Sequence, residues 1–257
     1  MSHVRGTGHR GLTAAAIAAL LLGGFASAHA ALTTPACLAK KLTAWGNLRK
    51  CQATANGKVL QGKSADLAAC QTKFTATLTK LDAIATAAAI ACRYGVNSDG
   101  TVTDYDTGLV WEQKDNLDGT PNPADPHDAD NGYPWSAPGP APDGAAFTDF
   151  LASLNDCPSS DGTTLTGGFA GYCDWRLPSI VELAGIVDLS APGCRTFTGP
   201  CIDQTVFGPT VASAYWSATA DALTPDGAWF VSFRTGIDVH TDLKTFGFHV
   251  RGVRSGL

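Results

Sequence analysis

The sequence lacks most of the residue patterns that common enzymes and metal sites use. Its 6 histidines are scattered, and no two of its 8 cysteines are spaced as C-x-x-C. The hydrolase pattern G-x-S-x-G and the zinc-protease pattern H-E-x-x-H do not occur. These absences argue against a histidine metal centre, a zinc ribbon, a thioredoxin-like redox site and the commonest hydrolases. We therefore expect a protein that is not an enzyme.

Long apolar runs are scarce as well, and the one that stands out is at the N-terminus. A basic start precedes an apolar run over residues 12–25, and residues 28–30 form an A-x-A cleavage site. We interpret residues 1–30 as a secretory signal peptide that is cleaved after Ala30. The alternative is an uncleaved membrane anchor, but the run is shorter than the ~20 residues that cross a bilayer. We expect an exported protein (periplasmic, cell-surface or secreted) without a membrane span after cleavage.

Acidic and basic residues are unevenly distributed along the chain. Residues 31–92 contain 8 Lys and Arg against 2 Asp, whereas residues 93–257 contain 8 Lys and Arg against 21 Asp and Glu. Opposite charge balances in two segments predict two structural units. The basic unit could meet an anionic polymer, lipid headgroups or the acidic unit itself, or its lysines could form a solvated helix face. The acidic unit would repel a polyanion, so no nucleic-acid partner is expected.

Residues 31–92 have the pattern of a helical hairpin. Apolar residues recur there at helical spacing, and the segment contains a single proline. Gly57 and Gly62 interrupt the pattern, and Ser64 or Asp66 can cap the helix that follows. Two antiparallel helices are therefore predicted.

The even number of cysteines in an exported chain predicts disulfides. The predicted pairs are Cys51–Cys70 across the turn of the hairpin, Cys37–Cys92 as the pairing that then remains, Cys157–Cys173 around a loop rich in Gly, Ser and Thr, and Cys194–Cys201 around a short loop. The second of these pairs requires the second helix to end before Cys92, or the chain to fold back there.

Residues 93–257 predict an α+β domain. Strands are expected near residues 101–104, 107–112, 214–219, 228–233 and 246–254, and helices at residues 143–154 and 179–189. The strands and helices are segregated rather than alternating, which favours antiparallel sheets.

The segment Gly171–Leu183 contains several structural signals close together. Ser179 and Glu182 have the spacing of a capping box at a helix start. Asp174 and Arg176 are expected to form an ion pair beside Trp175, and Arg251 could join it.

Several segments of the acidic unit resemble one protein family when they are taken in order. They are D-G-T-V-T-D, T-G-L-V-W-E, H-D-A-D-N-G-Y-P-W, Y-C-D-W-R-L-P-S-I-V-E-L, F-G-P-T, Y-W-S-A-T, A-W-F-V-S-F and H-V-R-G-V-R. This order resembles the Lcl C-terminal domain family over about residues 93–257, with a helical hairpin where the namesake has a collagen-like stalk.

The resemblance implies a fold similar to the C-type-lectin and formylglycine-generating-enzyme superfamily. It implies that Thr101–Thr103 or Leu109–Trp111 pairs with the closing strand, Val250–Arg254. The namesake domain is implicated in adhesion and in binding sulfated polysaccharide. The related enzymes need a free redox or copper-binding cysteine pair, whereas the cysteines here are assigned to bridges.

Two sets of residues are candidates for a ligand site. The aromatic residues could stack on sugar rings or could be core residues; they are Tyr133, Trp135, Trp216 and Trp229. An acidic loop could coordinate calcium, the possible cofactor, or could be a solvated turn; its candidate ligands are Asp115, Asp118, Asp128, Asp130 and Asn131.

The sequence therefore predicts an exported, disulfide-bonded protein of three segments: a signal peptide (1–30), a helical hairpin (31–92) and a lectin-like domain (93–257). The expected function is recognition of an extracellular glycan or an envelope protein, with calcium as the candidate cofactor. The alternatives are a structural envelope protein without a small ligand, and an oxidase or hydrolase on the same scaffold.

Overall fold

The computed structural model describes residues 33–157, 167–236 and 239–256. The predicted signal peptide and its cleavage site lie outside these residues. Within the described ranges, none of the helices combines the length and the hydrophobicity that crossing a bilayer requires.

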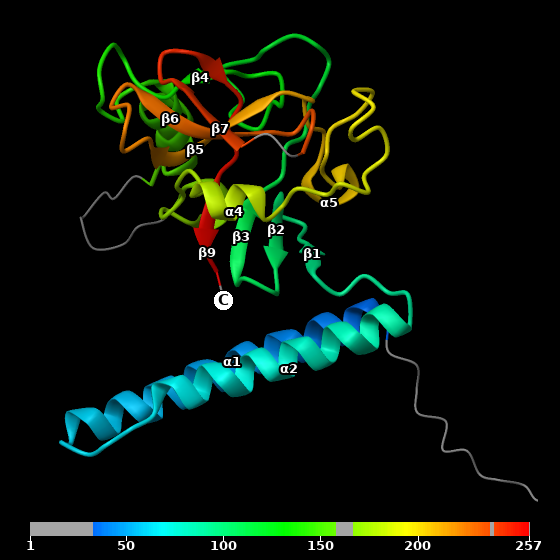
Figure 1. The fold of residues 1–257 in the computed structure, drawn as a ribbon, viewed down its shortest axis with the longest axis vertical. Coiled ribbons are helices and arrows are strands. Elements are labelled where there is room, and N and C mark those ends of the chain that lie inside the picture. Colours follow the sequence, from blue (N-terminus) through cyan, green and yellow to red (C-terminus); the bar gives the residue numbers. More distant parts are fainter. Residues whose placement is uncertain (1–32, 158–166, 237–238, 257) are drawn as a thin grey trace, which may run out of the picture. The chain divides into compact units, whose positions relative to one another are not determined.

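The N-terminal segment is a helical hairpin in which α1 (Thr34–Leu60) and α2 (Leu67–Ala87) run side by side (Figure 1). Thr33 caps α1, and the Asp66 carboxylate caps α2 by accepting a hydrogen bond of 2.9 Å from the Ala69 N–H. Gly57 does not break the first helix, which continues to Leu60 before Gly62 turns the chain with a φ of +71°. Only the second glycine therefore terminates a helix.

Two disulfides strengthen the thin core of the hairpin. Cys51 is bonded to Cys70 and Cys37 to Cys92, as predicted. Because α2 ends at Ala87, the chain can return to reach Cys37. The apolar contact between the helices is small and consists mainly of Ala44, Leu48, Cys70, Phe74 and Leu78. A hairpin with so little buried surface depends on its cross-links, which are worth about 2–4 kcal/mol each.

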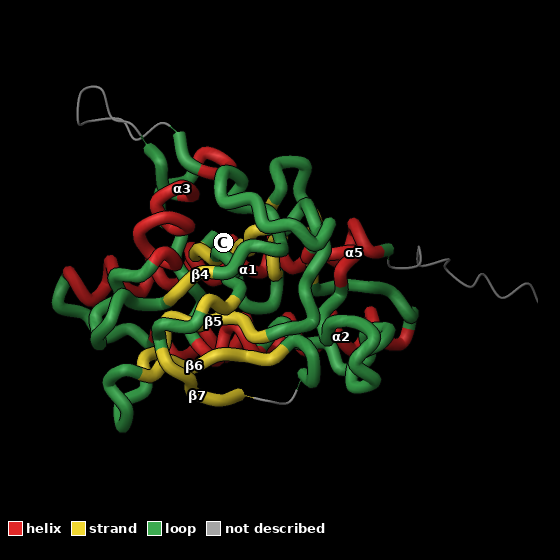
Figure 2. The backbone as a smooth tube through the Cα atoms, turned by 90° about the horizontal axis from the view of Figure 1, so that it is seen from above, coloured by secondary structure: helices red, strands yellow, loops and turns green. Residues whose placement is uncertain are grey.

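The described residues after the hairpin form an α+β domain with three antiparallel sheets. A four-stranded sheet has the order β1 (Tyr94–Val96), β2 (Thr101–Asp104), β3 (Leu109–Glu112) and β9 (Val253–Ser255). A three-stranded sheet has the order β5 (Ala214–Ala220), β6 (Gly227–Ser232) and β7 (Val239–Leu243) (Figure 2). A small sheet pairs β4 (Tyr133–Pro134) with β8 (Gly247–Phe248).

The closing strand lies beside an early strand, as the family resemblance implies. Trp111 of β3 is paired with Val253 of β9, so the second of the two expected pairings is confirmed. The end of the chain is not one alternating strand over residues 246–254, however. It is divided into β8 and β9, which belong to different sheets.

Four short helices complete the domain. A π-helical segment, Ala146–Leu151, continues into α3 (Ala152–Leu154), where the sequence predicts one regular helix. The capping-box helix α4 (Ile180–Ala184) is confirmed but ends before Leu189, and α5 (Gln204–Phe207) was not anticipated. A single 3₁₀ turn occupies Phe169–Gly171.

Two apolar clusters form the core of the domain. One joins the four-stranded sheet to α4 and to the three-stranded sheet through Trp111, Leu183, Tyr215 and Val231. The other contains Phe150, Trp175, Trp216 and Val250 among its members. The alternating side chains of β3 and β5 reach both clusters, because neighbouring residues of a strand point to opposite faces.

The hairpin contacts the domain near the turn between β2 and β3. Lys41 is fully buried and pairs with Asp82 at 2.5 Å and with Asp106. The indole N–H of Trp45 donates to the Tyr105 carbonyl oxygen at 2.9 Å. A side chain at Gly108 would collide with the Trp45 ring at 2.8 Å, so this glycine permits the close approach.

Candidate functional site

The capping-box segment forms ion pairs different from those that the sequence suggests. Ser179 and Glu182 make the reciprocal capping box, as predicted. Arg176 pairs with Glu182 at 2.7 Å, however, and Asp174 pairs with Arg254 at 2.6 Å. The predicted Asp174–Arg176 pair is therefore wrong, because the turn into α4 brings the capping glutamate back to Arg176. Trp175 is buried beside them and is a core residue.

Arg251 does not join these pairs. It is completely buried, and it donates to the carbonyl oxygens of Glu112 at 2.9 Å and Phe207 at 2.8 Å and to the Thr210 hydroxyl at 3.0 Å. The prediction that it could join the acid pair is wrong, because its guanidinium holds three segments together inside the domain. Its role is structural.

A buried ion cluster lies next to Arg251. The Glu112 carboxylate accepts hydrogen bonds from Lys114 Nζ at 2.8 Å and from the backbone N–H of Gly252 at 2.8 Å, and it contacts His127 Nδ1 at 2.9 Å. Glu112 is completely buried and Lys114 almost completely. Lys114 Nζ also donates to the carbonyl oxygen of Pro126 at 2.7 Å. The cluster therefore anchors the acidic loop (residues 114–131) to the sheet at Lys114 and at Pro126.

Electrostatics keep the Glu112 carboxylate ionised. Burial alone would raise the pKa of Glu112, but Lys114, His127 and Arg251 outweigh it and lower that pKa to about 2. Burial lowers the pKa of Lys114, and the attraction of Glu112 opposes this change. The two charges depend on each other, as is usual for a buried pair.

The carboxylates of the acidic loop are largely used within the loop. Asp128 accepts from the Asp130 N–H at 2.8 Å and from the Asn116 side chain at 3.2 Å. Asp130 accepts from the N–H groups of Asp118 and Gly119 at 2.9 and 2.8 Å. These are the turn-stabilising bonds that Asp and Asn form with nearby backbone.

The predicted calcium ligands are not brought together as a cation site. Among the described residues no group of three or more His, Cys, Asp or Glu is arranged to hold a metal ion. Asn131 is buried and directs its amide N–H groups to the carbonyl oxygens of Asn122 and Asp125. Asp115 lies near Asp125 and has a pKa raised by partial burial and by that neighbour. The calcium hypothesis from the sequence is tested by the titration given below.

Three of the four candidate aromatic residues are core residues. Tyr133, Trp135 and Trp216 are buried, and their rings pack against those of Phe150, Phe147 and Phe248 at 5.5, 5.0 and 4.4 Å. Lys244, also buried, holds its ammonium group 4.2 Å from the Trp135 ring centroid. Rings enclosed in this way cannot stack on a sugar.

Trp229 is the candidate that reaches the surface. It is half-buried on β6 and is paired across the sheet with Thr241 of β7. The pairing register places Val239 and Leu243, which are exposed, on the same face as Trp229. Val231 shares this face but is buried in the core cluster, so the face is open only around Trp229 and along β7. We call Trp229, Val239, Thr241 and Leu243 the Trp229 face.

Polar groups border the Trp229 face. Asp221 follows β5, and its carboxylate accepts a hydrogen bond from the Leu223 N–H at 2.9 Å. This bond, with contributions from Thr224 and from the Thr241 hydroxyl, lowers the pKa of Asp221 and keeps it ionised. A half-buried indole flanked by a hydroxyl and a carboxylate offers stacking and hydrogen bonding to one ligand.

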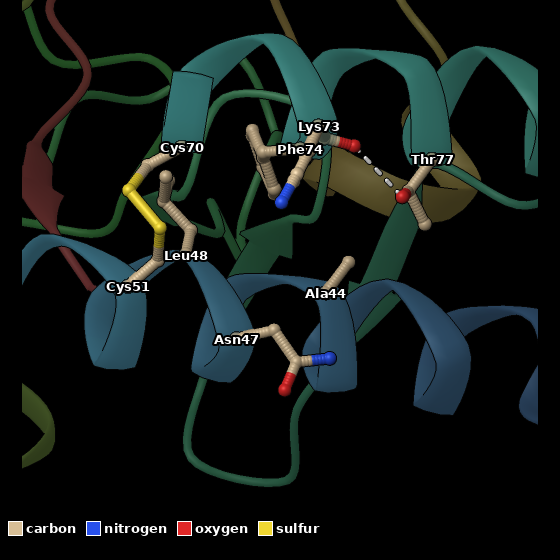
Figure 3. A pocket seen from close by; sticks show the side chains of 8 residues that line it. All are labelled: Ala44, Asn47, Leu48, Cys51, Cys70, Lys73, Phe74 and Thr77. Carbon is tan, nitrogen blue, oxygen red and sulfur yellow. Dashed lines mark hydrogen bonds between the residues drawn. A yellow bond between two sulfur atoms is a disulfide. The ribbon is translucent and has the colours of Figure 1, made fainter. Parts of the chain in front are cut away.

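A second surface feature is the groove between α1 and α2. Figure 3 shows one pocket of about 240 Å³, in which Asn47 and Leu48 of α1 face Lys73 and Phe74 of α2 beside the Cys51–Cys70 disulfide. A neighbouring pocket of about 500 Å³ extends along the helices to Lys50 and Lys58. The groove is thus lined by lysines.

The turn of the hairpin contains the residue spacing of a phosphate-binding loop, G-x-x-x-x-G-K-[ST], at residues 57–64. Such a loop needs a preceding strand and a helix that starts at the lysine. Gly57 instead lies inside α1, and α2 starts only at Leu67, where Asp66 occupies its N-terminus. The match is therefore one of spacing alone.

Sequence reasoning missed the cluster of Glu112, Lys114 and His127. The nearest signal is that Glu112 and Lys114 lie two apart at the end of a predicted strand, so they share a face. Nothing in the sequence places His127 or Arg251 beside them. That proximity depends on the fold of the acidic loop and on the pairing of β3 with β9.

Comparison with known proteins adds one finding. The model of the Lcl C-terminal domain matches residues 100–254, which is more than half of the chain. A search of the curated proteins finds no match. This chain therefore belongs to the Lcl C-terminal domain family.

Proposed function

We propose that this chain is an exported, non-catalytic recognition protein that binds a glycan or a protein at the cell envelope. We assign the binding to the Trp229 face of the C-terminal domain. The observation that carries the proposal is the combination of the half-buried Trp229 with the Thr241 hydroxyl and the Asp221 carboxylate on one side of the sheet.

Export is supported by the state of the cysteines. All 8 are joined in four disulfides, and none is free. Disulfides form and persist in oxidising compartments such as the periplasm and the extracellular space. The same bridges occupy the thiols that a redox or copper centre would need.

A binding role is supported by the chemistry of the Trp229 face. Trp229 provides a flat ring with little conformational freedom to lose, and such residues dominate the binding energy of many interfaces. Val239 and Leu243 extend the apolar surface along the edge strand β7, which pairs only with β6 among the described strands. An exposed edge strand with apolar side chains can also pair with an extended segment of a partner.

The test is a glycan array probed with the oxidised protein, with Trp229→Ala and Thr241→Ala variants beside it. Removing the indole should weaken binding by about 2 kcal/mol or more, roughly 30-fold in affinity. Phe197→Ala, which removes an exposed ring elsewhere, is the matched control and should bind normally. A protein ligand is sought in parallel by cross-linking envelope extracts to the wild type and to the Trp229→Ala variant.

Two results would contradict the proposal. Unchanged binding in a folded Trp229→Ala variant would exclude this face as the site. No glycan on the array and no cross-linked protein that depends on Trp229 would favour a structural envelope protein without a ligand.

A further inference from the structure

The turn of the hairpin exposes an unusual amount of apolar surface. Val59, Leu60 and Leu67 have exposed fractions of 53%, 89% and 43%. They lie within nine residues of one another, at the end of α1 and the start of α2. We call residues 58–67 the hairpin tip. Single exposed apolar residues are ordinary, but three at one turn form an apolar patch whose exposure to water is unfavourable.

Cations surround this patch. Lys58 and Lys63 belong to the tip, and Lys50 and Lys73 line the groove behind it. Lys50 is about 12 Å from Lys58 along the helix axis. None of these four lysines forms an ion pair with a carboxylate of the described residues, whereas Lys41, at the other end of α1, forms two.

The carboxylates of the hairpin leave an excess of positive charge at the tip. Asp66 belongs to the tip and caps α2, but the four lysines outnumber it, and Asp82 pairs with Lys41. The tip therefore combines exposed apolar side chains with a net positive charge. Surfaces of this composition lie in the interface of anionic membranes, with apolar groups among the acyl chains and cations at the headgroups.

We propose that the hairpin tip docks on the surface of an anionic phospholipid membrane. Val59, Leu60 and Leu67 enter the boundary between headgroups and acyl chains, and Lys58 and Lys63 contact the phosphates. The acidic domain of a second copy would satisfy the lysines, but its exposed Val239 and Leu243 belong to the Trp229 face, which we assign to another ligand. A bilayer supplies both kinds of contact, so it is the occupant that fits the tip.

The inference goes beyond ligand binding by the Trp229 face and does not depend on it. It gives the hairpin a role of its own, in which the hairpin holds the acidic domain at the envelope. The two proposals use residues in different parts of the chain, so they are tested with different variants.

The experiment is co-sedimentation of the disulfide-bonded protein with vesicles. One set contains phosphatidylcholine alone, and the other contains phosphatidylcholine with about 30% phosphatidylglycerol. Both are assayed at about 0.1 M salt. The protein should bind the phosphatidylglycerol vesicles, and the affinity should fall about five-fold for each unit of positive charge removed from the tip, so a Lys→Glu change counts twice. Leu60→Ser should reduce it by about ten-fold.

Matched controls separate the tip from general effects of charge and hydrophobicity. Lys40→Glu makes the same charge change about 30 Å away on the same helix and should leave binding nearly unchanged. Leu223→Ser removes a leucine that is 93% exposed in the acidic domain, and it should also have little effect. Circular dichroism and the melting temperature verify that Lys58→Glu, Lys63→Glu and Leu60→Ser variants are folded.

Several results would overturn the inference. They are equal binding to both vesicle types, absence of binding to either, and equal losses in the tip and control variants. Inhibition by millimolar inorganic phosphate would indicate a site for the free anion instead of a membrane. Self-association that disappears in the tip variants, without vesicle binding, would assign the tip to a second copy of the chain.

Discussion

The substitution Glu112→Gln tests whether the buried ion cluster holds the acidic loop on the domain. The introduced side chain has nearly the same size but carries no charge. Lys114, which is almost completely buried, would lose the carboxylate 2.8 Å from its ammonium group. It would keep its hydrogen bond to the Pro126 carbonyl oxygen, but that oxygen is neutral and does not balance the ammonium charge. His127 would lose its anionic partner at 2.9 Å.

The magnitude follows from the cost of leaving one buried charge unpaired. Breaking a buried pair from one side destabilises a protein by about 3–5 kcal/mol. For a chain of this size each kcal/mol lowers the melting temperature by about 2–4 °C, so the expected fall is roughly 6–20 °C. Replacing both charges, as in Glu112→Gln with Lys114→Met, should recover part of this loss, because no ion is then left without a partner.

The assay is thermal and urea unfolding of the oxidised protein, followed by tryptophan fluorescence. Asp226→Asn removes an exposed carboxylate that has no ion pair among the described residues, and it should shift the melting temperature by about 1 °C or less. If Glu112→Gln behaved like this control, the cluster would contribute no net stability. If the double substitution were less stable than the single one, the unpaired lysine would not be the cause.

The remaining predictions concern pH, the contact between hairpin and domain, and calcium. Because the pKa of Glu112 is about 2 in the fold and near 4.5 when unfolded, stability should be lost as the pH falls from about 4.5 towards 2 in the wild type, with a shallower loss in Glu112→Gln. Burial lowers the pKa of His249 below 6.5, so the unfolded chain takes up a proton first, and stability should decline as the pH falls below about 6.5; His249→Gln should flatten that part of the profile. Lys41→Met removes a buried cation and strands Asp106, so protease cleavage between α2 and β2 should become faster than in Lys40→Met, and equal rates would contradict the contact. Saturating calcium should leave the melting temperature unchanged, because carboxylates in residues 115–131 already accept backbone N–H groups, whereas a rise would support the calcium site.

The features that sequence predicted well are governed by neighbouring residues. The capping box of Ser179 and Glu182 and the cap at Asp66 involve groups three residues apart, which local backbone geometry brings together. The disulfides across the turn and around short loops follow from the same proximity. Local spacing therefore predicted the elements and their covalent links.

The features that sequence missed depend on segments far apart in the chain. Asp174 binds Arg254 because the segment at Arg176 pairs with Val253 of β9, and the register of that pairing cannot be derived from either segment alone. The complete burial of Trp216 could not be predicted from the sequence either. Its alternation with Tyr215 separates two faces of β5, but both faces are covered, one by each apolar cluster. Alternation shows which residues share a face and does not show which face meets water.

The placement of the cations connects the two proposals. In the acidic domain Lys114, Lys244 and Arg251 are buried, and Arg176 and Arg254 pair with carboxylates. Three carboxylates, Asp104, Glu112 and Asp128, are buried as well, so the surface of the domain keeps the acidic excess of its composition. Such a surface repels anionic membranes and polyanions, which favours neutral or cationic ligands at the Trp229 face.

In the hairpin the arrangement is reversed, because Lys41 is the buried cation and the lysines near Leu60 are exposed and form no ion pair with a carboxylate of the described residues. An anionic surface would therefore attract the hairpin tip and repel the domain, which orients the domain away from the membrane. Reversing the charge of Lys58 and Lys63 should abolish that orientation while ligand binding at Trp229 continues. A loss of both functions together would show that the two units do not act separately.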